Sequence, residues 1–244
     1  MRSRDLALGL ALLVVGCEGN KASPTAASST AATAASASGA VASASATPIS
    51  RAADDAALRA LLADYKKAIY ARDGEKAAAL VAEPTITYFE AVRKDALYAA
   101  EADVRKKPLM DRLMVVIVRA RVDADRLRKS DGKGLFVHAV NEGMVGEEAR
   151  TLEPGAVEVE GDLGKIGIRS GKDEVPPDLG FRAYRESGTW KLDVMSVSKI
   201  GAPALQKVLQ DIDPDVDQAM LKLLEMMTGR KIGLEIYKPI DPPK

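Results

Sequence analysis

Hydrophobic and polar positions divide the chain into three segments with different patterns. An apolar run of eleven residues, Leu6–Gly16, follows a short basic start. Residues 22–50 contain no charged side chain and are almost entirely Ala, Ser and Thr. From Arg51 onwards, apolar residues recur at helical spacing and later at strand spacing. We therefore expect one globular domain over residues 51–244, preceded by two segments that do not belong to its core.

The domain opens with the apolar period of amphipathic helices. A first helix, which Asp54 or Asp55 can cap, is expected to stop near Asp73. Its apolar face consists of Leu58, Leu61, Leu62, Tyr65 and Ile69. A short Ala-rich helix over residues 75–82 should then end before Pro84, because the residue before a proline is disfavoured in a helix.

Three more helical segments are expected before the pattern changes. Thr85 can cap a helix with Ile86, Phe89, Val92, Arg93 and Ala96 on one face. Residues 109–122 are ambiguous, because their β-branched run also suits a buried strand. Pro108 and Asp111 are typical of a helix start and favour the helical interpretation. A further helix is expected around residues 135–144.

The middle of the domain has the alternating period of strands. Two alternating segments, 157–160 and 166–169, flank a turn at residues 161–164. A second pair of strands, 181–184 and 190–197, is joined by another short turn. Consecutive strands with short turns predict an antiparallel sheet of roughly four strands with one buried face.

Helical spacing returns after the sheet. Two helices are expected at residues 203–212 and 214–228, with Gly229 at the stop, and a tail over 232–240 should dock in extended form. The predicted fold class is α+β, with N-terminal helices packed on the sheet and a C-terminal helical pair after it. Residues 201–244 are either part of the single domain or a helical extension of it.

The opening helices and the segment Glu186–Val194 (ESGTWKLDV) resemble the nuclear-transport-factor-like fold, also called ketosteroid-isomerase-like. The resemblance covers about residues 52–197 and implies a cone-shaped pocket. One alternative function is therefore small-molecule binding or catalysis in such a pocket, using a carboxylate and a tyrosine such as Tyr88. The resemblance carries over no functional residue.

The N-terminal pattern concerns export and attachment. The run Leu6–Gly16 is too short for a transmembrane helix, which needs about 20 apolar residues, and fits the core of a signal peptide. Its end, Val-Val-Gly before Cys17, resembles the lipobox of bacterial lipoproteins. The resemblance implies that residues 1–16 are removed and that a diacylglyceryl group is attached to the Cys17 thiol. The expected partner of Cys17 is thus a membrane.

Residues 17–50 are expected to be a disordered tether behind the lipidated cysteine, because they lack an apolar stripe to pack. Glu18 stands where the sorting rule of enteric bacteria places an Asp for inner-membrane retention. Its identity favours the outer membrane. The expected location of the domain is the cell envelope, outside the cytoplasm, in the periplasm or at the surface.

Charge argues against nucleic-acid binding. The chain has 35 Lys and Arg and 35 Asp and Glu, and the residues before Arg51 contain three of the former and two of the latter. The domain therefore carries a net charge of −1, and no basic patch that would follow phosphates stands out in the sequence.

Candidate catalytic groups are scarce. His138 is the single histidine, so a multi-histidine metal site is excluded, and its apolar neighbours indicate a structural role. The acidic run 211–217 lacks the glycine and the glutamate of a calcium loop and suits helix-end chemistry, while Trp190 is expected to pack in the core. We expect no catalytic, metal or cofactor residue. The predicted function is a non-enzymatic binding domain whose partner is an envelope protein or a small ligand.

Overall fold

The computed structural model describes residues 48–146, 152–170 and 173–242. Cys17, the expected export signal and almost all of the expected tether lie outside the described residues. The described domain begins at helix α1.

Seven α-helices precede the sheet in the described part of the chain. Their bounds are α1 (Pro48–Tyr70), α2 (Gly74–Leu80), α3 (Glu83–Tyr98), α4 (Glu101–Lys106), α5 (Leu109–Arg121), α6 (Ala124–Lys129) and α7 (Gly132–Asn141). The helices predicted at residues 75–82, 109–122 and 135–144 are confirmed, with bounds that differ by a few residues. The hydrophobic pattern does not predict α4 and α6, because each has only six residues and buries one of them.

Helix α1 begins earlier than its predicted cap, and both aspartates proposed for that role lie inside the helix. Asp55 pairs with Arg59 one turn further on (Oδ1–Nε 2.7 Å). Asp54 accepts hydrogen bonds from Trp190 Nε1 (3.1 Å) and from Arg185 (2.7 Å) on the sheet. The predicted cap is wrong because the preceding alanines extend the helix and the Asp54 carboxylate serves tertiary contacts.

The boundary between α2 and α3 also differs from the prediction. Helix α2 ends at Leu80, and α3 begins one residue before Pro84, which occupies its first turn as prolines often do. Thr85 is therefore not a cap. Its fully buried hydroxyl accepts from the Val194 N–H (3.1 Å) and donates to the Asp193 carboxylate (3.4 Å), which ties α3 to the end of the last strand.

The sheet is antiparallel and has five strands rather than the expected four. Its strands are β1 (Glu153–Glu160), β2 (Leu163–Ser170), β3 (Asp173–Val175), β4 (Phe181–Glu186) and β5 (Thr189–Asp193). The order is β1-β2-β4-β5, and the short β3 pairs with the end of β2. Strand β3 escaped prediction because three residues are too few to show an alternating pattern.

One face of the sheet is apolar and lies against α1. Its buried side chains are Ile166, Ile168, Phe181, Ala183, Trp190 and Leu192. Gly164 belongs to the same face, and a Cβ there would lie 2.8 Å from Leu58 Cδ1 on α1, so the glycine permits the close approach of helix and sheet. The alternate residues, such as Lys165 and Arg182, face away from α1, which gives the expected one-sided sheet.

The predicted C-terminal helical pair is present as α8 (Ser198–Ile212) and α9 (Val216–Thr228). Helix α9 ends at Gly229 in the left-handed conformation (φ 67°), as expected. The tail differs from the expected extended form, because residues Leu234–Tyr237 make a 3₁₀ helix, η4, with Tyr237 fully buried. Both helices pack on α5, and their apolar residues belong to the same core as those of the other helices and the sheet.

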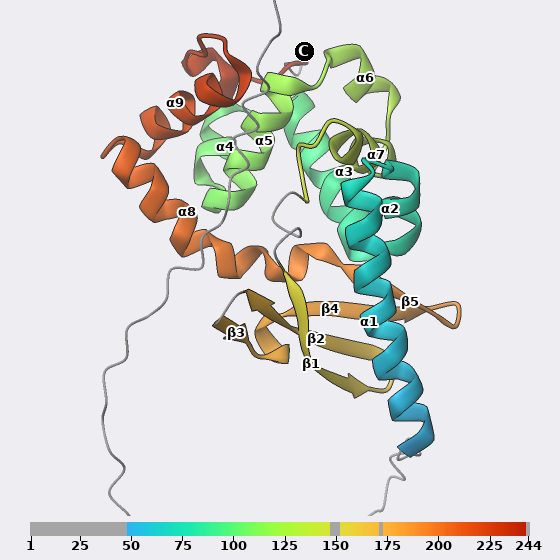
Figure 1. Cartoon of the computed structure of the whole chain (residues 1–244). Coiled ribbons are helices and arrows are strands. Elements are labelled where there is room, and N and C mark those ends of the chain that lie inside the picture. The colour runs from blue at the N-terminus through green and yellow to red at the C-terminus, as the bar shows by residue number, and fades with distance from the viewer. Residues whose placement is uncertain (1–47, 147–151, 171–172, 243–244) are drawn as a thin grey trace, which may run out of the picture.

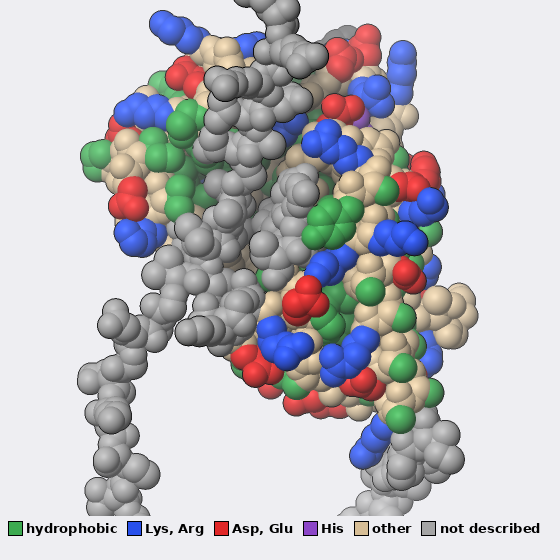
Figure 2. Space-filling model, in the orientation of Figure 1, with side chains coloured by type: hydrophobic (Ala, Val, Ile, Leu, Met, Phe, Trp, Pro, Cys, Tyr) green, Lys and Arg blue, Asp and Glu red, His purple; other side chains and the backbone are tan. Residues whose placement is uncertain are grey.

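Figure 1 shows where the ends of the domain lie. The sheet and the start of α1 occupy one end, and α6 with the C-terminal residues occupies the other. On the face in Figure 2, acidic and basic side chains are interspersed over the sheet and α1. Within the described ranges, no helix is both long enough and apolar enough to span a membrane.

Candidate functional site

The residues that the sequence singled out do not form one site. Trp190 is buried beneath the Arg185 guanidinium, which lies 4.2 Å above its ring, so it packs as expected. Burial lowers the pKa of the half-buried His138, and the neighbouring charges of Arg126 and Arg121 lower it further. Cys17, the expected lipidation residue, lies outside the described part of the chain.

Tyr88 was the candidate residue of the pocket hypothesis. Its hydroxyl donates to Asp111 Oδ1 (3.2 Å), and burial raises the pKa of the phenol, as does the nearby Asp111 charge. Neither Tyr88 nor Asp111 lines either of the two surface hollows described below. The tyrosine and the carboxylate are thus engaged with one another.

The acidic run 211–217 acts at helix ends, as expected, and Asp215 is the cap of α9. Asp215 accepts from the N–H groups of Asp217 and Gln218, whereas Asp213 pairs with Lys222. Among the residues that the structure describes, no three His, Cys, Asp or Glu side chains gather to hold a metal ion.

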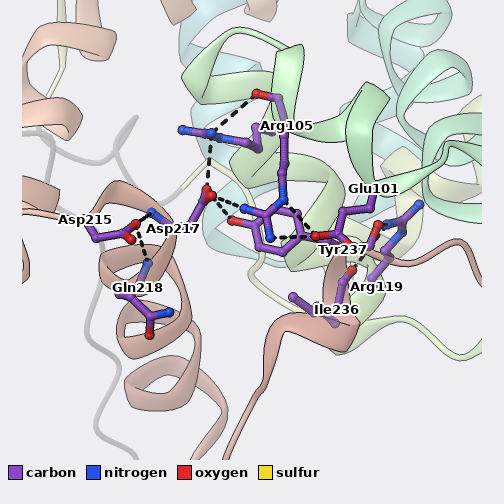
Figure 3. Close-up of polar contacts among 9 residues, drawn as sticks. Glu101, Arg105, Arg119, Asp215, Asp217, Gln218, Ile236 and Tyr237 are labelled. Atoms are coloured by element: carbon purple, nitrogen blue, oxygen red, sulfur yellow. Dashed lines mark hydrogen bonds and ion pairs between the residues drawn. The ribbon is translucent and has the colours of Figure 1, made fainter.

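Asp217 instead points into a polar cluster between α4, α5, α9 and η4 (Figure 3). Its carboxylate accepts a hydrogen bond from the Tyr237 hydroxyl (2.9 Å) and forms ion pairs with Arg105 and with Arg112 (3.2 Å). The Arg105 guanidinium also lies 4.2 Å from the centre of the Tyr237 ring. These contacts fix the C-terminal tail against the helices.

Arg119 lies on α5 beneath the C-terminal tail and is only 9% exposed. Its five N–H groups donate to five backbone carbonyl oxygens at 2.6–3.2 Å: those of Asp95, Ala96, Ala99, Ile236 and Tyr237. Three of these carbonyls belong to the C-terminal end of α3, where a positive charge is favourable. Burial lowers the pKa of Arg119 to about 10, so the guanidinium stays charged at neutral pH.

Beside Arg119 the surface is hollowed in two adjoining places that share Asp123. The first hollow, of about 430 Å³, is lined by residues 119–123, 230–232, 235 and 236. The second, of about 500 Å³, is lined by Asp123, Asp125, Arg126, Lys129 and Ser130. We call the two together the cationic hollow, because six Lys and Arg but only three Asp and Glu line it.

Most cations of the hollow have no carboxylate partner in the described ranges. Five of them form no ion pair with any carboxylate in the described ranges: Arg121, Arg126, Lys129, Arg230 and Lys231. Arg128, on the same short helix α6, is by contrast bonded to Asp125 and, through two bonds, to Asp241. On helix α6, the paired Arg128 therefore contacts the C-terminal tail, whereas the unpaired Arg126 and Lys129 line the hollow.

The three carboxylates of the hollow already have protein partners. Asp123 caps α6 by accepting from the N–H groups of Asp125 and Arg126. The Asp125 carboxylate pairs with Arg128 (2.7 Å), and Glu235 accepts from the Gly233 N–H (3.0 Å). The unbalanced charge at the surface of the hollow is therefore positive.

Sequence reasoning missed this site because its cations come from distant segments. Arg121 ends α5 and Arg230 follows α9, and only the packing of α9 and η4 against α5 brings them together. A signal was present in the doublet Arg230-Lys231 directly after the Gly229 stop, where a cation also favours the end of a helix.

Comparison with known proteins gives no further guidance. The chain matches no protein-family model, no curated protein and no solved structure.

Proposed function

We propose that this chain is a lipoprotein of the bacterial cell envelope whose domain binds a partner rather than catalysing a reaction. The diacylglyceryl group on Cys17 would hold the chain in a membrane, and residues 18–47 would link the lipid to α1. The identity of Glu18 favours the outer membrane over the inner membrane. The binding surface would be the cationic hollow.

The observation that carries this proposal is the position of the hollow relative to the start of α1. The chain enters the domain at the end that holds the sheet, whereas α6 and the C-terminal tail, which border the hollow, lie at the opposite end (Figure 1). A domain tethered through α1 would present this surface away from its own anchor.

Electrostatics favour binding over acid–base catalysis. In the described ranges every carboxyl group with a shifted pKa is shifted down, by hydrogen bonds from Arg, Lys or backbone N–H groups: Asp54, Asp73, Glu90, Asp213 and Asp241. A general acid needs the opposite shift. The catalytic alternative with Tyr88 gains less support, because Tyr88 and Asp111 are bonded to each other outside both hollows.

The anchor is tested by metabolic labelling with a palmitate analogue and by membrane fractionation. We expect the wild-type chain to be labelled and to sediment with membranes, and Cys17→Ala to lose both properties. Glu18→Gln is the matched control and should keep the label. A wild-type chain without label, together with a Cys17→Ala chain that stays in the membrane fraction, would contradict the lipid anchor.

A further inference from the structure

The cationic hollow has a defined excess of charge. Six cationic and three anionic side chains line it, which leaves three positive charges. The carboxylates are bonded to the backbone at a helix cap, to Arg128 and to the Gly233 N–H, so none of them forms an ion pair with the five unpaired cations. Arg119 adds charge from the wall but offers no donor, because all of its N–H groups are bonded to carbonyls.

Two guanidinium groups of the first hollow are oriented by backbone oxygens. Arg230 donates to the Ala120 carbonyl (2.6 Å), and Arg121 donates to the Glu142 carbonyl (3.4 Å). A guanidinium has five N–H donors, so one bond orients the group and leaves the other donors for a ligand. The neighbouring Lys231 is exposed and has no bonded partner among the described residues.

These features select the chemistry of the ligand. Arginine side chains bind carboxylate and phosphate groups through paired hydrogen bonds, and such charge-assisted bonds are the strong ones. An excess of three charges favours a group that carries more than one negative charge, which distinguishes phosphate from a single carboxylate. The volumes of about 430 and 500 Å³ fall within the range of small-ligand sites.

We infer that the cationic hollow binds a phosphate-bearing ligand, with Arg121, Arg230 and Lys231 contacting the phosphate oxygens. The inference rests on the proposed function only in taking the hollow as the binding surface. It does not depend on Cys17, so the failure of one would leave the other standing. Arg126 and Lys129 extend the site toward a second phosphate or an adjoining anionic group.

Calorimetric titration of the full chain, purified in a neutral detergent, with inorganic pyrophosphate tests this inference. We expect saturable binding that weakens as salt is added, and about tenfold or more weaker binding in the variant Arg121→Gln/Lys231→Gln. Arg182→Gln is the matched control, because Arg182 is exposed and unpaired but lies on β4 in the sheet. The thermal midpoints of all three chains should agree, which separates lost binding from lost folding.

Two results would overturn the inference. The first is the absence of saturable pyrophosphate binding by the wild-type chain. The second is an equal loss of pyrophosphate affinity in Arg182→Gln and in Arg121→Gln/Lys231→Gln, which we call the hollow variant. That result would indicate a general attraction to the charge of the protein rather than a site.

A second arm distinguishes a soluble phosphate ligand from a lipid headgroup. Lipidated protein in phosphatidylcholine vesicles is mixed with separate phosphatidylglycerol vesicles, and clustering is followed by light scattering. Clustering that the hollow variant abolishes identifies the phosphate as that of a facing membrane. Pyrophosphate binding without clustering identifies a soluble ligand. Clustering that persists undiminished in the Arg121→Gln/Lys231→Gln variant shows that the hollow does not contact the facing membrane, and the absence of pyrophosphate binding overturns the inference whatever the vesicles do.

Discussion

Two groups of arginines at the same end of the domain differ in how their hydrogen-bond donors are used. Arg119 gives all five N–H groups to carbonyl oxygens, and Arg105 is bonded to Glu101 and Asp217. Arg121 and Arg230 each hold one carbonyl and no carboxylate in the described ranges. The first group is bonded to carboxylates or to a full set of carbonyls and serves the fold, whereas the second keeps donors for a partner.

Helix geometry accounts for this difference between near neighbours. Arg119 and Arg121 are two positions apart on α5, and residues with that spacing do not share a helix face. Arg119 therefore points to the end of α3 and the tail, and Arg121 points to the surface. The same residue type takes a structural role or an exposed one according to its angle on the helix.

Removing the saturated arginine should have the largest effect. Arg119→Met would leave five buried or half-buried carbonyl oxygens without their donor, and we expect the free energy of unfolding to fall by about 3–5 kcal/mol. Urea denaturation measures it. Arg121→Met is the matched control and should change stability by less than about 0.5 kcal/mol. Equal losses of unfolding free energy in Arg119→Met and Arg121→Met would contradict the difference between the two arginines.

The tail contact should contribute less. Tyr237→Phe removes the hydrogen bond to Asp217, which keeps its ion pairs with Arg105 and Arg112. We expect a loss of about 1–2 kcal/mol in the same urea experiment. Tyr98→Phe is the control, because Tyr98 is 52% exposed and should be neutral. An unchanged Tyr237→Phe would show that the cluster does not fix the tail.

Acid should weaken the ion pair between Asp54 on α1 and Arg185 on β4. The hydrogen bond from Arg185 holds the pKa of Asp54 below its ordinary value, although burial opposes the shift. A lowered folded-state pKa gives stability that is present above the unfolded pKa, about 3.9, and is lost as the pH falls through the folded value. The free energy of unfolding should therefore decline below about pH 4, and less steeply in Asp54→Asn. An identical pH profile in both chains would contradict this role of Asp54.

The long periodic elements could be predicted from sequence because their signal is local. Helices α1, α5 and α9 show their apolar faces, and the β1–β2 and β4–β5 hairpins show alternation. The helices α4 and α6 and the strand β3 are too short for a period to appear. The burial of Arg119 was hidden because an arginine in a helix is ordinarily a surface residue, and only the tail supplies two of its five acceptors.

The hollow was beyond sequence reasoning for a different reason. Its net charge arises from residues that share neither a helix face nor a chain segment, and the domain as a whole is close to neutral. A charge count along the chain includes acidic residues that lie elsewhere in the fold. It also includes acids such as Asp123 whose carboxylates cap a helix. The proposed attachment through Cys17, in contrast, is inferred from four consecutive residues.

The central claim is that the arginines without a carboxylate partner, Arg121 and Arg230, bind phosphate, while Arg119 and Arg105 do not. NMR of the arginine Nε–H groups, recorded on the full chain during titration with pyrophosphate, tests it residue by residue. We expect the signals of Arg121 and Arg230 to shift with one binding curve, while those of Arg119 and Arg105 stay in place. Unmoved Arg121 and Arg230 signals, or shifts of the same size at Arg182, would contradict it.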